Sequence, residues 1–275
     1  MGEFLSCFAS LLLLTLAPPV VLGLAVWLCQ RTFCIFVGEY SGRPLLLAAS
    51  ALSTPLREAG HALGCMLFFH RIEDMCLFNA NDPDGELGFV EHSYNPRNPI
   101  ALLGNLAYAL APVALGLFAV LIVFLSCFRG VIGPFFDEIA LLREGSAGFA
   151  DYARTTFSLI PQMFGGGTAG VVSKIIGTVL LVLICLGIHV TPRDLADAFS
   201  GFLIYAGVAA LTSFVLVLFD VRVVRMVIAG LGSFATAVTA LFAVVLLAAA
   251  ALLAVGAVFF LIRTLFELDR VESDK

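Results

Sequence analysis

A charged triplet interrupts an apolar run near residue 60, where Arg57 and Glu58 are followed by His61. In the motif H-E-x-x-H, two histidines four residues apart lie on one helical face and bind zinc, and the glutamate acts as general base toward a zinc-bound water. Glu58 and His61 match the glutamate and the second histidine, but Arg57 holds the position of the first ligand. A guanidinium stays protonated and has no free lone pair, so Arg57 cannot bind zinc and would repel the cation.

The composition places this triplet in a membrane protein. The chain has 275 residues, of which 61% are hydrophobic and 13% charged, and its mean hydropathy is +1.05. A soluble domain needs a polar shell around its core, and the longest apolar runs exceed the roughly 20 residues that span a bilayer. We therefore predict an integral, multi-pass membrane protein surrounded by a lipid bilayer. The net charge of −5 is spread through short loops and indicates neither a nucleic-acid partner nor an acidic tail.

The predicted fold is all-α, a single polytopic membrane domain over residues 1–275 with about six transmembrane helices. The predicted spans are approximately 5–28, 45–69, 100–128, 171–189, 199–219 and 233–266. Residues 129–170 combine apolar side chains at helical spacing with charged ones, which predicts an amphipathic region at the membrane interface.

Residues 70–98 form the most polar loop of the chain. Asp82-Pro83-Asp84-Gly85 is a tight-turn signal, and the strand-like stretches Leu77-Phe78 and Leu87–Val90 flank it. A small hairpin is therefore expected in this loop.

Seven cysteines occur without any C-x-x-C pair, at positions 7, 29, 34, 65, 76, 127 and 185. Most lie in or beside apolar segments, so we interpret them as small buried hydrophobic residues rather than as a disulfide framework.

Three interpretations of the triplet remain open, because charged residues inside a span usually face a bundle interior or a wet cavity. In the first, His61 binds zinc and Glu58 activates a water. In the second, Arg57 forms a buried ion pair with Glu58 or a distant acid and locks the bundle. In the third, which can coexist with the others, Gly60 and Gly64 form a small-xxx-small face on which another helix packs closely.

The stretch Glu58-Ala59-Gly60-His61-Ala62-Leu63 resembles the active-site helix of intramembrane zinc metallopeptidases of the site-two-protease type, in which H-E-x-G-H-A is common. Gly104-Asn105-Leu106-Ala107, followed by Ala111-Pro112, is similar to a Gly/Pro/Asn-containing stretch on a helix beside the active site of those proteins. The resemblance covers roughly residues 45–125. It implies that Glu58 is the general base, that His61 is a zinc ligand and that Asn105 lies near the site.

The third ligand of that family is an aspartate in a later span, and the segment that carries it has no counterpart here. Asp194, which follows Pro192, is the positional candidate. Further ligands could come from Cys65, four residues after His61, or from His92 and His189. His70, at the end of the predicted second span, is expected to lie at the membrane interface.

Arg57 would sit about where the charge of the zinc would be, and could pair with Glu58 or Asp194 in place of the metal. This favours a non-catalytic protein without zinc that binds or regulates a membrane-protein partner. The alternative is an active, zinc-dependent membrane peptidase with rewired ligands. A second alternative is a small-solute transporter, which predicts paired broken helices and an internal repeat.

Overall fold

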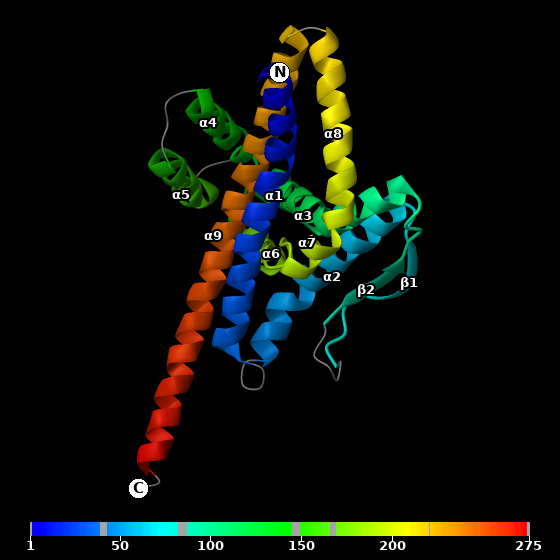
Figure 1. The fold of residues 1–275 in the computed structure, drawn as a ribbon. Coiled ribbons are helices and arrows are strands. Elements are labelled where there is room, and N and C mark those ends of the chain that lie inside the picture. The colour runs from blue at the N-terminus through cyan, green and yellow to red at the C-terminus, as the bar shows by residue number, and fades with distance from the viewer. Residues whose placement is uncertain are drawn as a thin grey trace.

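The structure, a computed structural model, describes residues 2–38, 43–81, 87–144, 149–165, 169–219 and 221–273, and it is helical apart from one small hairpin (Figure 1). The helices are α1 (Gly2–Val37), α2 (Arg43–Leu67), α3 (Pro99–Cys127), α4 (Ile132–Glu144), α5 (Phe149–Gly165), α6 (Val171–Cys185), α7 (Pro192–Asp197), α8 (Phe199–Phe219) and α9 (Val221–Ser273). The strands are β1 (Arg71–Cys76) and β2 (Phe89–Ser93). The helical class predicted from the sequence is confirmed.

Four helices are long and apolar enough to cross a membrane: α1, α3, α8 and α9. The predicted total of about six is not reproduced by length and hydropathy within the described residues. Helix α6 is apolar but has only 15 residues, and α2 carries too many polar side chains.

The two longest helices, α1 and α9, lie side by side and run in the same direction, so the termini lie at opposite ends of the molecule (Figure 1). Gly256 of α9 permits their close approach, since a Cβ there would lie 3.0 Å from the buried ring of Phe33. Helix α9 begins well before the predicted span at 233. Arg222 and Arg225 precede the predicted start of the span. They lie exposed on the first turns of α9 and so belong to the helix.

Helices α2 and α3 pack closely through two glycines of α2. A Cβ on Gly60 would lie 2.5 Å from the Cα of Pro112, and one on Gly64 would lie 2.9 Å from the Cα of Tyr108. Only a hydrogen atom fits at either position, because the opposing atoms belong to the backbone of α3. The predicted small-xxx-small packing face is therefore confirmed.

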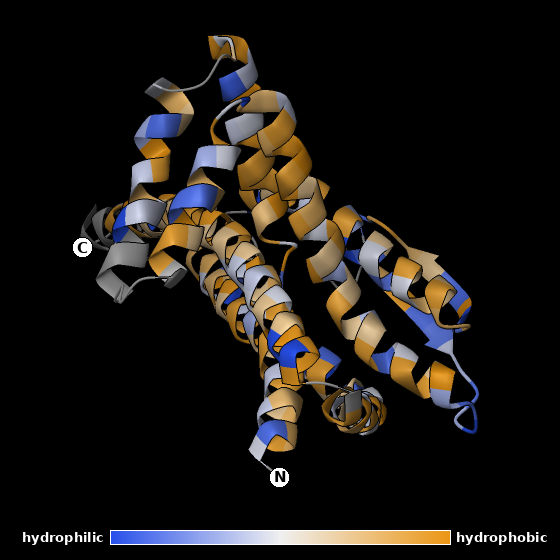
Figure 2. Ribbon diagram, turned by 90° about the horizontal axis from the view of Figure 1, so that it is seen from above, coloured by the Kyte–Doolittle hydropathy of each residue, from blue (hydrophilic) through white to orange (hydrophobic). Residues whose placement is uncertain are grey.

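The polar loop contains an antiparallel hairpin that lies beside α2 (Figures 1 and 2). Its register pairs Ile72 with His92 and Met75 with Val90. The strands differ from the expected ones, since Leu77 and Phe78 lie outside β1. The predicted turn at 82–85 falls outside the described residues. Figure 2 shows that the hairpin is among the most hydrophilic parts of the ribbon.

The region 129–170 forms two helices, α4 and α5. Phe135 and Ile139 of α4 and Leu159 of α5 are buried in the main hydrophobic core. The Thr155 hydroxyl donates a hydrogen bond of 2.9 Å to the Glu138 carboxylate and joins the two helices. These three residues therefore pack on the protein itself, whereas Leu141 of α4 and Phe157 of α5 remain exposed.

All seven cysteines are described and free, and three of them (Cys7, Cys65 and Cys185) are buried. The other four, Cys29, Cys34, Cys76 and Cys127, are half-buried.

We predict that Gly60→Leu separates α2 from α3 and lowers the free energy of unfolding by about 1–3 kcal/mol, because overpacking displaces backbone rather than a flexible side chain. Thermal unfolding of the purified protein in detergent measures this effect. Gly207→Leu on α8 is the matched control, since a Cβ at Gly207 meets nothing within 4 Å. Equal melting temperatures for the two variants would contradict the close packing.

Candidate functional site

Arg57 lies between two acidic side chains. Its Nη1 is 2.7 Å from Oε1 of Glu58, and its Nη2 is 3.6 Å from Oδ2 of Asp194. Glu58 is 2% exposed and Asp194 6%, whereas the side chain of Arg57 is 23% exposed. The structure thus forms the ion pairs that the sequence predicted for Arg57, with both acids at once.

Asp194 is held in place by the start of α7. The side chain of Thr191 caps this helix by accepting a hydrogen bond from the Asp194 N–H, at 3.1 Å. In return the Asp194 carboxylate accepts one from the Thr191 N–H, at 2.8 Å. This reciprocal arrangement is a capping box, and Pro192 at the first helical position favours the same geometry. Asp194 therefore serves both the helix cap and the ion pair.

His61 is buried beside these charges. A carbonyl oxygen can only accept, so the His61 Nδ1–H donates to the carbonyl of Tyr108, at 3.1 Å. The lone pair of the neutral ring then lies on Nε2, which has no hydrogen-bond partner among the described residues.

His189 is also buried, and its Nδ1–H donates to the carbonyl of Leu186 at 2.7 Å. Both His61 and His189 lie within electrostatic range of Arg57 and Asp194. We call the five residues Arg57, Glu58, His61, His189 and Asp194 the charged cluster.

Asn105 does not belong to the charged cluster by any described contact. It is buried on α3, and its Nδ2 donates a hydrogen bond of 2.8 Å to the hydroxyl of Ser200 on α8. Its observed role is to join two helices.

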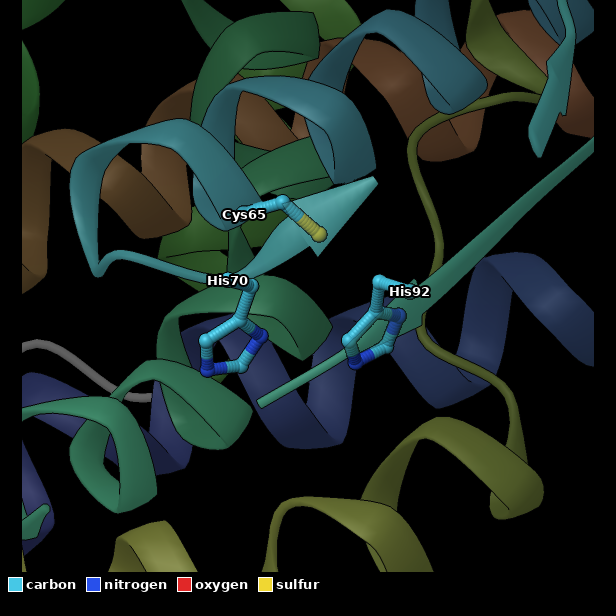
Figure 3. A group of neighbouring side chains, drawn as sticks. All are labelled: Cys65, His70 and His92. Atoms are coloured by element: carbon cyan, nitrogen blue, oxygen red, sulfur yellow. The ribbon is translucent and has the colours of Figure 1, made fainter. Parts of the chain in front are cut away.

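A second group of side chains brings a thiol and two imidazoles together (Figure 3). One donor atom from each of Cys65, His70 and His92 lies within 4.8 Å of the other two. We call these three residues the Cys-His cluster. The structure therefore places two predicted ligand candidates, Cys65 and His92, with His70 rather than with His61.

His70, which was expected at the end of a span, has its side chain buried within the protein (6% exposed). Helix α2 ends with Phe69 in the left-handed region, at φ 61°, and the His70 N–H bonds back to the Cys65 carbonyl at 2.9 Å. This is the six-to-one hydrogen bond of a Schellman motif, and it turns His70 back beneath Cys65. Gly104 makes room for the ring, since a Cβ there would lie 2.5 Å from His70 Nε2.

His92 reaches the Cys-His cluster from β2. Its ring centroid is 5.0 Å from that of His70, and the two rings are nearly parallel. Burial, together with the neighbouring His70, lowers the pKa of His92. His92 is therefore neutral at pH 7, with a lone pair available.

Tyr108 of α3 links the two clusters. Its ring centroid is 4.2 Å from that of His61 and 4.3 Å from that of His92. Neither Tyr108 nor His70 was predicted from the sequence to be a site residue. The only signal for His70 was its position directly after the helix that carries Cys65, and no sequence pattern indicated Tyr108.

No protein-family model matches this chain, and comparisons with curated proteins and with solved structures find no match. Functional assignment therefore rests on the geometry of the two clusters.

We predict that Arg57→Met lowers the free energy of unfolding by about 3 kcal/mol, because it leaves two buried carboxylates without their cation. Adding Glu58→Gln removes one of those charges and restores about 1 kcal/mol or more of the loss. Denaturant or thermal unfolding in detergent measures both variants.

Arg71→Met is the control for this pair. Arg71 forms an ion pair of 3.6 Å with Glu73, but its side chain is 81% exposed, so water screens the charges and the expected loss is below about 1 kcal/mol. A loss for Arg57→Met no larger than for Arg71→Met would show that Arg57 does not stabilise the bundle.

Proposed function

We propose that this chain is a non-catalytic membrane protein related to the intramembrane zinc metallopeptidases through the helix that carries Glu58 and His61. Arg57 supplies a fixed positive charge where those enzymes hold a metal. The bundle that surrounds it then binds or regulates a membrane-protein partner. The observation that supports this proposal is the double ion pair of Arg57 with Glu58 and Asp194.

Electrostatics supports a role for Arg57 in place of a metal. A metal ion would attract the buried carboxylates around it, and the guanidinium of Arg57 pairs with both Glu58 and Asp194 in the same way. An unpaired buried charge costs several kcal/mol, and the ion pairs of Arg57 lower that cost in the absence of an ion. A dication near His61 would also be repelled by the adjacent guanidinium.

We propose that α1, α2, α3, α8 and α9 cross the bilayer and that α6 does not, and three features support this placement. Helix α2 turns its polar side chains inward and leaves Leu52, Leu63 and Met66 exposed, as expected of a helix in contact with lipid. Helix α6 is about 23 Å long, too short to cross a core of about 30 Å, and would enter the bilayer without crossing it. Five crossings, by α1, α2, α3, α8 and α9, agree with the parallel course of α1 and α9.

The exposed apolar side of α2 is the surface that we propose for the partner. It lies on the same helix as Arg57, Glu58 and His61, and the hairpin lies beside this helix (Figure 1). A transmembrane segment packed on this side would contact Leu63 and Met66, and its binding could be sensed by the cluster one turn away.

A second candidate function is that of an active peptidase with rewired ligands. The observation in its favour is His61 Nε2, a buried lone pair without a partner among the described residues. A metal bound there would require Arg57 to move away from Glu58.

Zinc content distinguishes the two candidates. We predict that the protein purified in detergent, in a Cys65→Ala background that removes the other cluster's thiol, holds no zinc at the charged cluster. Arg57→His in the same background restores the H-E-x-x-H motif and is expected to acquire about one equivalent, measured by elemental analysis. Arg43→His, on the same helix but away from the cluster, is the control.

Each other outcome of this experiment counts against the proposal. Zinc in the parent that disappears with His61→Ala would contradict the metal-free charged cluster and favour the second candidate. Zinc in neither the parent nor Arg57→His would contradict the relation to the metallopeptidases.

The partner is tested separately, in native membranes. We predict that a photo-crosslinking amino acid at Met66 yields one discrete adduct with a second membrane protein, because this side of α2 is open to a neighbouring helix. The same amino acid at Val215, exposed on α8, is the control. Identical adduct patterns at both positions, or no adduct at Met66, would overturn partner binding on α2.

A further inference from the structure

We infer that Cys65, His70 and His92 form a binding site for a thiophilic metal ion, Zn(II) or Cu(I), separate from the charged cluster. One donor atom of each residue lies within 4.8 Å of the other two. In a tetrahedral zinc site the donors lie about 3.3 to 3.6 Å apart, given metal–nitrogen and metal–sulfur distances near 2.0 and 2.3 Å. Side-chain rotation, chiefly of the half-buried His92, closes this difference.

The tautomer of His70 is already set for binding a metal. Its Nε2–H donates to the carbonyl of Ala101 at 2.7 Å, which leaves the lone pair on Nδ1. Histidines that bind metals commonly donate their other ring N–H to a backbone carbonyl, which fixes the ring and the tautomer. Nδ1 is buried and has no partner among the described residues.

Aromatic packing alone does not account for this arrangement. The ring of His70 stacks on Tyr94 and on His92, with centroids 4.9 and 5.0 Å away. Stacking would be served as well by an apolar ring, whereas a buried acceptor without a partner costs about 1–3 kcal/mol. A bound cation would satisfy that acceptor, and the fully buried thiol of Cys65 lies beside it (Figure 3).

The donor set selects the ion. One thiolate and two imidazoles suit Zn(II) and Cu(I), whereas Mg²⁺ and Ca²⁺ prefer oxygen ligands. Binding releases the thiol proton of Cys65 to solvent and leaves both histidines neutral. Three protein ligands also leave one coordination position open for water or another donor.

The three ligands come from different parts of the fold. Cys65 lies on α2, His70 lies in the turn after it, and His92 lies on β2. An ion held by all three would fasten the hairpin to the helical bundle, so its binding energy would also stabilise the fold. A two-stranded hairpin is marginally stable by itself, which makes this cross-link useful.

The test uses the full chain, purified in detergent and stripped of metal under reducing conditions. Zn(II) and Cu(I) are each titrated in competition with a chromophoric chelator, which identifies the preferred ion. We expect about one equivalent to bind, with a rise in melting temperature. Cys65→Ala and His92→Ala are expected to weaken binding by more than about 100-fold, since even outer contacts of a metal site contribute 10- to 100-fold.

Two controls address thiols and histidines elsewhere. Cys76→Ala removes the cysteine at the end of β1, and His189→Gln alters the charged cluster. Both are expected to bind as the unaltered chain does. A further measurement uses the unaltered chain. Co(II) bound to it should show a thiolate-to-cobalt charge-transfer band in the near ultraviolet.

Several outcomes would overturn the inference. These are no binding of either ion at micromolar concentration, full binding by Cys65→Ala, or bound Co(II) without the charge-transfer band. Binding lost in His189→Gln but retained in Cys65→Ala would place the ion at the charged cluster, which contradicts the proposed function as well.

Discussion

The neutralisation of buried charge around Arg57 is the constraint on which the rest of the structure depends. Glu58 sits on α2 and Asp194 on α7, so one guanidinium joins two elements that are far apart in the sequence. In a bundle with an apolar exterior, neither carboxylate can be left without a cation or a hydrogen-bond donor. The capping box at Thr191 meets part of this need for Asp194.

Helix α2 is organised by the requirement that its polar side be covered. Gly60 and Gly64 bring α3 into backbone contact, and the same approach places the Tyr108 carbonyl within reach of His61. On another side, Gly88 before β2 lies against the Glu58 side chain, since a Cβ there would lie 3.0 Å from Cγ of Glu58. Close packing and burial of the charges are therefore two results of the same small residues.

The two clusters are neighbours with different chemistry. The charged cluster is held together by the ion pairs of Arg57 and leaves Nε2 of His61 unsatisfied, whereas the Cys-His cluster offers a thiol and two imidazoles and leaves Nδ1 of His70 unsatisfied. Tyr108 contacts a histidine of each, so a change in the ring of His92 has a physical route to His61. We propose that these roles are divided between them: charge neutralisation at Arg57, and metal binding at Cys65, His70 and His92.

Composition and local spacing alone determined the helical membrane class, the glycine face at Gly60 and Gly64, and Arg57 as a cation that cannot bind a metal. These follow from periodicity within one segment and from the chemistry of single side chains. The grouping of Cys65 with His70 and His92, the burial of Asn105 against Ser200 and the long course of α9 were decided only by tertiary structure. Each depends on contacts between segments distant in the sequence. The turn that carries His70 inward could not be predicted, because it places Phe69, a residue type seldom found at positive φ, in that conformation.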